Sequence, residues 1–376
     1  MNNNGNDSAS QSNQQILKIF GTDYKKITKE ILSVANLADI IKNREAVVGI
    51  KPNVVVPSPA ENGGTTHPEV VAGIIEYLQE MGFNNIIVVE GAWVGDKTSV
   101  AFECCGYNAL AKQYGIRLVD TQKDTWHEIN CGGMSLNIND IVDEIDFLIN
   151  VPVLKGHCQT KMTCALKNMK GLIPNIEKKR FHRIGLHKPI AYLNKGIRQD
   201  FIVVDHICGD LDFEEGGNPV VCNCVMAASD PVLLDTYVCK LLQISVDEVP
   251  YIRIAEQLGI GSTDLSKAEI LFLNSDIKDD ILPRKNQILD VSYAVEEVDC
   301  CSACYGNLIH AMNQLKKEGL TDRLQNRIAI GQGMQGETGK LGIGNCTKGF
   351  EYCIMGCPPD SKKIYRELKT YILENK

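Results

Sequence analysis

Short apolar, β-rich runs alternate with helical segments from residue 46 onward, and this pattern constrains the fold more than any other feature of the sequence. Strands that are separated by helices are joined by crossovers, which gives a mostly parallel sheet with flanking helices. The expected strands are residues 46–56, 85–90, 116–120, 146–154 and 201–204, and the expected helices are residues 66–81, 98–114 and 230–242. The sequence therefore predicts an α/β body built around such a sheet.

Two of these helices have recognisable first turns. Thr66 or His67 is expected to cap the helix that continues to residue 81, with Pro68 in its first turn. Asp230 is expected to cap the helix that continues to residue 242, and Pro231 follows it directly.

Polar residues stand where several of the predicted strands end. Lys51 and Asn53 lie in the second half of the first expected strand, Lys155 and His157 follow a later one, and Asp205 follows the last. In open α/β sheets the ligand crevice lies beyond the carboxyl ends of the strands. We therefore expect these side chains to form part of a binding site.

Six of the 15 cysteines lie close to the C-terminus, at Cys300, Cys301, Cys304, Cys346, Cys353 and Cys357. A Cys-x-x-Cys pair and a distant cysteine before proline are typical of iron–sulfur sites, where four thiolates converge from short turns. We predict a [4Fe–4S] cluster bound by Cys301, Cys304, Cys346 and Cys357. Cys300 and Cys353 are alternative ligands, or indicate a second or larger cluster.

Other interpretations of these six cysteines stay open. Zinc prefers a second tight Cys-x-x-Cys pair or a histidine pair, so the wider spacings disfavour it. A redox-active dithiol formed by Cys301 and Cys304 is another alternative. The last is a set of six thiols that bind nothing.

The chain is expected to have three parts. Residues 1–14 are polar and of low complexity, which predicts a disordered tail. Residues 15–290 form the α/β body, with two lobes divided near residue 150 as an alternative. Residues 291–376 form the small cysteine-rich iron–sulfur module, and a loop-rich stretch at 282–291 precedes it.

Composition and charge bear on compartment and partners. Charged residues make up 23% of the chain and the formal net charge is -8, with both signs interspersed, which argues against nucleic-acid binding. No stretch approaches the roughly 20 apolar residues of a membrane span, and the N-terminus has no signal-peptide pattern. We therefore expect a cytoplasmic protein with no membrane partner, in which the cysteines are thiols or metal ligands.

Five motifs occur in order along the body: Lys51-Pro52-Asn53, residues 64–69 (GTTHPE), residues 150–157 (NVPVLKGH), residues 165–171 (ALKNMKG), and Asp230-Pro231 with Asp235. Together they resemble the domain-of-unknown-function 362 (DUF362) family, many of whose members carry iron–sulfur clusters. The resemblance covers residues 45–262. It implies the α/β fold and the cluster, and it implies no particular activity because the family has none settled.

The lysines and histidines of these motifs suit a cationic pocket for a small anionic substrate or cofactor that carries carboxylate or phosphate. Histidine is the usual acid or base at neutral pH. The catalytic candidates are Lys155, His157, His67 and Lys167. The candidates for ligand or cofactor binding are Lys51, Asn53, Thr66, Asn168, Lys170 and Asp205.

Three functions fit the sequence. The first is an iron–sulfur oxidoreductase of anaerobic metabolism, whose cluster transfers electrons to an anionic ligand in the cleft and which would need a redox partner protein. The second is a non-redox isomerase, racemase or lyase with a structural or Lewis-acidic cluster. The third is an electron carrier or cluster-handling protein.

Overall fold

The computed structural model describes residues 14–274, 281–282 and 289–374. Contacts divide the chain into two compact units, Met1–Phe181 with Leu186–Arg284, and Lys285–Lys376 with His182–Gly185. The predicted tail, apart from residue 14, lies outside the described residues, and so do residues 283–288 of the expected loop.

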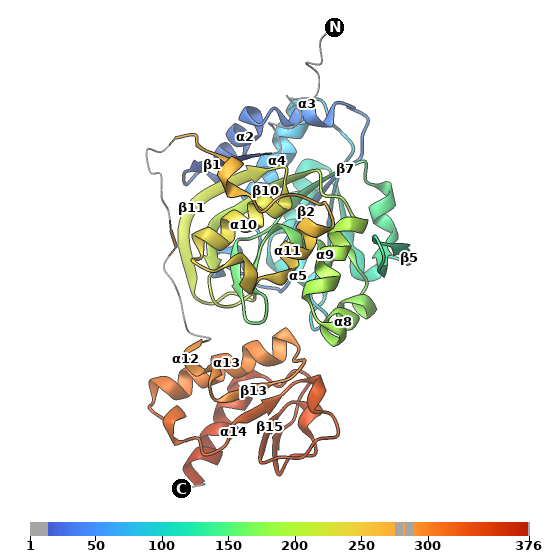
Figure 1. The fold of residues 1–376 in the computed structure, drawn as a ribbon. Helices are drawn as coiled ribbons and strands as arrows, with labels where there is room; N and C mark the ends of the chain where they lie inside the picture. Colours follow the sequence, from blue (N-terminus) through green and yellow to red (C-terminus); the bar gives the residue numbers. More distant parts are fainter. Residues whose placement is uncertain (1–13, 275–280, 283–288, 375–376) are drawn as a thin grey trace. The chain divides into compact units, whose positions relative to one another are not determined.

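An eight-stranded sheet forms the centre of the first unit (Figure 1). In spatial order its strands are β12 (Glu269–Phe272), β1 (Gln15–Phe20), β11 (Pro219–Ala228), β10 (Phe201–Asp210), β7 (Phe147–Val151), β2 (Val48–Pro52), β3 (Ile86–Glu90) and β4 (Arg117–Asp120). The pairs from β10 through β4 are parallel, as is β1 with β12, whereas β11 is antiparallel to both of its neighbours. The predicted mostly parallel sheet with flanking helices is confirmed.

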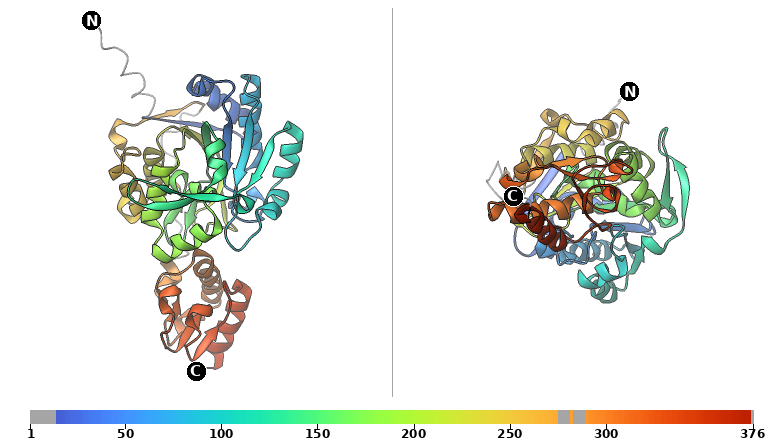
Figure 2. Two further views of the ribbon diagram at one scale, coloured as in Figure 1. Left: turned by 90° about the vertical axis from the view of Figure 1, so that its right-hand side faces the viewer. Right: turned by 90° about the horizontal axis from the view of Figure 1, so that it is seen from below.

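Helices lie on both sides of this sheet (Figure 2). They are α2 (Tyr24–Val34), α3 (Leu37–Ile41), α4 (Pro68–Glu80), α5 (Thr98–Cys104), α6 (Tyr107–Tyr114), α7 (Ala165–Asn168), α8 (Asn175–Ile184), α9 (His187–Gly196), α10 (Pro231–Leu241) and α11 (Pro250–Gln257). Two small hairpins complete the unit, β5 (Trp126–Asn130) with β6 (Ser135–Asn139), and β8 (Lys155–His157) with β9 (Lys161–Thr163).

The sheet is buried on both faces, as expected for parallel strands. Successive residues of β3 alternate between two cores: Ile87 and Val89 belong to one, and Ile86 and Val88 to the other. The first core includes side chains of α7, α9, α10 and α11, and the second includes those of α2, α4, α5 and α6.

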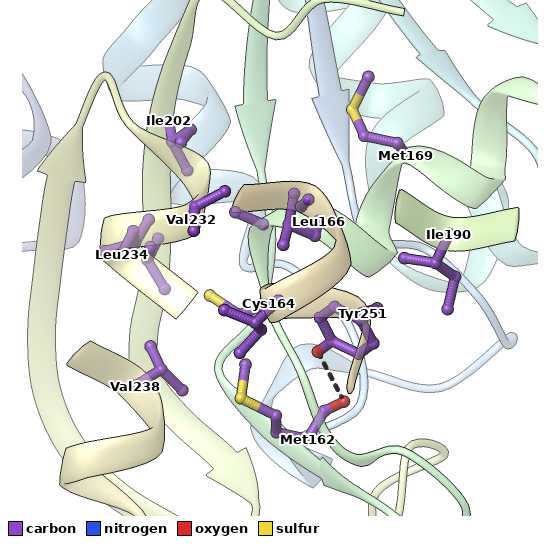
Figure 3. Packing of buried hydrophobic residues seen from close by; sticks show 14 of the residues in the cluster. Met162, Cys164, Leu166, Met169, Ile190, Ile202, Val232, Leu234, Val238 and Tyr251 are labelled. Atoms are coloured by element: carbon purple, nitrogen blue, oxygen red, sulfur yellow. Dashed lines mark hydrogen bonds between the residues drawn. The ribbon is translucent and has the colours of Figure 1, made fainter. Parts of the chain in front are cut away.

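The first core fixes the short helix α7 close to the sheet. Leu166 of α7 packs with Val232 of α10 and Tyr251 of α11, all fully buried (Figure 3). The hydroxyl of Tyr251 donates over 3.4 Å to the carbonyl of Met162, which lies in β9 just before α7. Helix α7 is therefore held by apolar packing against α10 and α11.

The sheet reverses its strand order between β2 and β7. From β2 the chain proceeds outward to β3 and β4, and it returns to the other side of β2 as β7, where Lys51 is the register partner of Asn150. In open α/β sheets, ligands bind at such a switch point, beyond the carboxyl ends of the strands. Lys51, Asn53 and Lys155 belong to this edge of the sheet.

Several element boundaries differ from the expected ones. The expected helix 98–114 is two helices, because Gly106 between them has a left-handed backbone (φ 78°). The expected strand 201–204 extends to Asp210, so Asp205 lies within β10 and not at its end. Strands β1, β11 and β12 were not predicted.

The two expected helix caps had different outcomes. Asp230 caps α10 as expected, because its carboxylate accepts the amides of Val232 and Leu233. His67 occupies the cap position of α4 and Pro68 its first turn, yet neither the His67 nor the Thr66 side chain caps that helix. The Thr66 hydroxyl instead accepts from Asn53 N and donates to the Val151 carbonyl.

The second unit has its own four-stranded parallel sheet. Its strands, in spatial order, are β13 (Val295–Glu297), β14 (Ile328–Ile330), β15 (Leu341–Ile343) and β16 (Tyr352–Ile354), and its helices are α12 (Leu289–Ser292), α13 (Ser302–Lys317) and α14 (Ser361–Glu374). Residue 150, the alternative division point of the body, lies inside β7 of the first unit.

No helix among the described residues has the length and apolarity of a membrane span.

Candidate functional sites

A buried polar network joins the carboxyl ends of β2, β3 and β7. The Lys51 ammonium donates to Glu90 Oε2 and to the Pro52 carbonyl, each over 2.8 Å. The Asn168 side chain accepts from Asn53 Nδ2 and donates to Asn150 Oδ1, each over 2.7 Å. Burial lowers the pKa of Lys51, and the charge of Glu90 opposes this effect. These buried hydrogen bonds, of which the Lys51–Glu90 pair is charge-assisted, thus fix the strand ends to one another.

Glycines allow this network to pack closely. A side chain at Gly171 would collide with the Glu90 carboxylate and the Lys51 side chain, and one at Gly91 would collide with Thr121. The buried ammonium of Lys178 donates to the carbonyls of Gly91 and Ala92 over 2.9 and 2.8 Å.

Beside this network, several basic groups converge on the carboxylate of Glu214. Glu214 Oε2 lies 2.6 Å from Lys167 Nζ and 2.9 Å from His157 Nε2. The Glu214 backbone carbonyl accepts from Lys155 Nζ over 2.7 Å. Despite burial, the interactions of Glu214 with His157 and Lys167 hold its pKa well below its usual range. These basic groups form an anion-binding site, and the carboxylate of Glu214 occupies it.

His157 enters this site as a neutral hydrogen-bond donor. Its Nδ1 accepts the amides of Gln159 and Thr160 over 3.0 and 3.1 Å, so the ring proton resides on Nε2 and points to Glu214. Burial, together with the charge of Lys167, lowers the pKa of His157 to about 4. Near neutral pH the ring therefore donates to an anion without carrying charge.

Lys155 contacts backbone carbonyls and an amide oxygen rather than the Glu214 carboxylate. Its ammonium donates to Asn53 Oδ1, the Gly64 carbonyl and the Glu214 carbonyl, so all three protons are used. Burial lowers the pKa of Lys155 to about 8. These contacts suit Lys155 to fixing the Glu214 segment against the sheet edge.

Lys170 differs from the other lysines of the site in its contacts. It lies in the turn Met169–Leu172 and is half-buried, and the described residues offer its ammonium no hydrogen bond or ion pair. Burial, and then the charge of Lys167, lower the pKa of Lys170 to about 7. An amine that exchanges its proton near pH 7 is suited to general acid and base catalysis.

Two aspartates hold the segments that carry these groups. Asp235 of α10 accepts the amides of Ala165 and Leu166, which begin α7 and so position Lys167 and Asn168. Asp210 accepts the amides of Asp212, Phe213 and Asn218 and thereby fixes the turn that carries Glu214.

His67 lies apart from the Glu214 carboxylate and pairs with Asp205. The Asp205 carboxylate is 2.8 Å from His67 Nδ1 and also accepts the His67 amide over 2.7 Å. Although burial acts to lower it, the charge of Asp205 raises the pKa of His67 to about 10. His67 therefore carries a proton at neutral pH.

Four of the six C-terminal cysteines act electrostatically on one another. Cys301 precedes α13 and Cys304 lies in its first turn, whereas Cys346 lies in the turn Asn345–Thr347 and Cys357 follows β16. Burial raises the pKa of Cys304 to about 12, and the charges of Cys301, Cys357 and Cys346 act in the same direction. Cys346 and Cys357 also raise the pKa of Cys301, after burial.

The other two cysteines have different surroundings. Cys300 is buried and its sulfur donates to the Cys301 carbonyl. Cys353 contacts Thr347, Met355 and the Gly344 carbonyl. None of these contacts of Cys353 is to another cysteine.

The side chains of the second unit do not form a preformed site for a single metal ion in the part of the chain that the structure describes. No set of three or more Cys, His, Asp or Glu side chains close enough for one ion occurs within residues 14–274, 281–282 and 289–374. Around a single zinc, thiolates sit about 2.3 Å from the ion and hence within about 4 Å of one another. In a cubane cluster each thiolate binds a different iron, which requires a wider separation.

Comparison with known proteins identifies the family of the body. The family model described as Domain of unknown function (DUF362) matches residues 48–240. This chain belongs to the DUF362 family. The thylakoid-associated protein sll1697 of Synechocystis sp. is 26% identical over 252 residues, which are 64% of this chain and 75% of that protein.

A solved structure also aligns with the chain. The lactate racemase apoprotein from Thermoanaerobacterium thermosaccharolyticum aligns with a TM-score of 0.42 and 13% identity. The alignment covers 62% of this chain and 58% of the racemase chain.

The DUF362 region contains the whole basic site. The structure brings together Lys155, His157, Lys167 and Lys170 around Glu214, and links Lys51, Asn53, Thr66 and Asn168 in the adjacent network. Sequence reasoning missed Glu214, Asp210 and Lys178. The acidic pair Glu214-Glu215 before two glycines was the available signal for a turn that places a carboxylate.

Proposed function

We propose that this DUF362 protein is an enzyme that transfers protons on a small anionic ligand, as isomerases, racemases and lyases do. The observation that carries the proposal is the position of the Glu214 carboxylate between Lys167 and His157. A ligand carboxylate or phosphate would replace Glu214 there and accept the same hydrogen bonds. The ligand would then lie near Lys170, whose charge interacts with that of Glu214.

Each basic residue has a distinct role in this proposal. Lys167 and His157 bind the anion, and Lys155 positions the Glu214 segment. Lys170 takes or gives the proton, since the pKa of its amine is lowered to about 7. A base whose pKa lies near the working pH combines a useful population of the neutral form with adequate basicity.

We further propose that the second unit binds an iron–sulfur cluster through Cys301, Cys304, Cys346 and Cys357. The Cys-x-x-Cys pair followed by two distant cysteines supports this proposal, and so do the electrostatic interactions of Cys301 and Cys304 with Cys346 and Cys357. A bound cluster would supply electron transfer or Lewis acidity. The cysteine set also supports a second candidate function, an oxidoreductase that acts on the same anionic ligand with a redox partner.

Deuterium exchange separates these two candidates. The protein is incubated in D2O with a panel of small 2-hydroxy and 2-amino carboxylates, and loss of the hydrogen next to the carboxylate is followed by proton NMR. We expect exchange without any electron donor. Lys170→Met should slow it by about 100-fold or more, the usual contribution of a positioned acid or base.

Lys179→Met is the matched control, because Lys179 is an exposed lysine of the nearby helix α8. It should exchange at the wild-type rate. Exchange that appears only after a reductant or oxidant is added would favour the oxidoreductase instead. Equal rates in the Lys170 and Lys179 variants would remove Lys170 from the proposal.

A further inference from the structure

A buried cysteine completes a three-residue arrangement with the His67–Asp205 pair. The sulfur of Cys208 lies 3.8 Å from His67 Nε2, and its thiol donates to the Ala60 carbonyl over 3.3 Å. Asp205 and Cys208 both belong to β10, and His67 stands at the start of α4. The ring of Tyr24 packs edge-on against His67, with the ring centroids 5.4 Å apart.

The order of these groups matters for chemistry. Asp205 bonds to Nδ1 of His67, so Nε2 faces the sulfur, and the aspartate also fixes the His67 backbone amide. A nucleophile beside a histidine whose far nitrogen is oriented by a carboxylate is the general arrangement for acyl transfer. Because His67 is protonated, its Nε2 can give a proton to a leaving group beside the sulfur.

We infer that Cys208, His67 and Asp205 form a nucleophilic site that accepts an acyl group from an ester or thioester. The attack needs the deprotonated Cys208 sulfur, whose proton has gone to solvent; this sulfur forms a C–S bond with the carbonyl carbon while the carbonyl π electrons move to oxygen. When that intermediate collapses, the alcohol or thiol leaves and takes a proton from His67 Nε2. Water then attacks the thioester and gives a proton to His67 Nε2, the C–S bond breaks, and a carboxylic acid is released as the deprotonated sulfur and the protonated ring are restored.

This site uses neither Lys170 nor Glu214, so it does not rest on the function proposed above. It lies beside the anion site, because the Leu154 amide, one residue before Lys155, donates to the Asp205 carbonyl over 3.1 Å.

Cys105 provides a matched internal control. The two cysteines are almost equally buried, with Cys208 4% and Cys105 5% exposed. The sulfur of Cys105 contacts the Ser58 carbonyl and the Thr65 hydroxyl, and burial raises the pKa of this thiol. A difference in reactivity between Cys208 and Cys105 therefore reports the effect of the neighbouring histidine more than that of access.

Acetylation by p-nitrophenyl acetate at pH 7 tests the inference. Peptide mass spectrometry would measure the acetylation rates of both cysteines in the folded full-length protein. We expect Cys208 to react about tenfold faster or more, because a histidine lies beside its sulfur, whereas the sulfur of Cys105 contacts Ser58 and Thr65. His67→Gln and Asp205→Asn, each checked for folding by thermal denaturation, should slow Cys208 to the rate of Cys105.

Three results would overturn the inference. The first is acetylation of Cys208 no faster than that of Cys105 in the wild-type protein. The second is the absence of any acetylation of Cys208 in the folded state. The third is an unchanged rate in a folded His67→Gln variant. The wild-type comparison decides the question even if both variants fail to fold.

Discussion

At the scale of single residues, Glu214 and Glu215 are neighbours with opposite electrostatic properties. Interactions with neighbouring basic residues hold the pKa of Glu214 well below its usual range, whereas burial and the charge of Glu214 raise the pKa of Glu215 to about 7. Only the first carboxylate bonds to Lys167 and His157. In our account Glu214 occupies the ligand's place and competes with it.

Replacing Glu214 by glutamine should therefore tighten the binding of small anions. A charge-assisted hydrogen bond contributes roughly 1.5–3 kcal/mol, so loss of this competitor predicts about tenfold stronger binding or more. Titration calorimetry with inorganic phosphate measures the effect. Glu215→Gln removes the neighbouring carboxyl group but none of these bonds, so an equal gain in both variants would contradict a specific competition.

At the scale of elements, Asp235 connects two helices across the core. Its carboxylate accepts the amides of Ala165 and Leu166, although burial raises the pKa of this carboxyl to about 7. Asp235→Ala should lower the free energy of unfolding by about 1–2 kcal/mol, as loss of a capping side chain does. Urea denaturation measures the loss, and an unchanged midpoint would show that α7 is held by apolar packing alone.

The sequence predicted the elements whose signals are local. Strands β2, β3 and β7 are apolar runs with a polar residue at or next to their carboxyl ends, and α4 and α10 begin at prolines. Strands β1 and β12 were missed because their pairing joins segments more than 200 residues apart, such as Ile16 with Ala228 and Ile16 with Ile270. Strand β11 was missed although it also pairs with β10, which directly precedes it in the chain. The extension of β10 was missed because Asp205 and His206 are polar, yet both are buried.

The candidate site was predicted only in part, because only some of its residues lie in recognisable sequence motifs. Lys155 and His157 follow a strand in one motif, and Lys167 and Lys170 lie in another, so their residue types and spacing were visible. Glu214 comes from a turn more than forty residues further along, and only the tertiary structure places it among them. The position of Cys208 near His67 likewise depends on the register of β10.

At the scale of the whole molecule, we propose separate tasks for the two units: proton transfer in the first and cluster binding in the second. Serine variants of Cys301, Cys304, Cys346 and Cys357 should each lose most bound iron and sulfide after anaerobic purification, because each removes one ligand of the proposed cluster. Cys353→Ser should retain both, since the contacts of Cys353 are to Thr347, Met355 and Gly344. Iron analysis and absorbance spectra measure the outcome, and iron loss in Cys353→Ser alone would contradict this ligand set.

The most direct test of the central claim is deuterium exchange in a variant without the cluster. The double variant Cys301→Ser, Cys304→Ser is incubated in D2O with the carboxylate panel, with no electron donor, and compared with the same variant carrying Lys170→Met. We expect deuterium exchange to persist in the double variant and to be lost when Lys170 is also replaced. Exchange by the wild-type protein that disappears in the folded double variant would contradict it, because the body would then depend on the cluster for its chemistry.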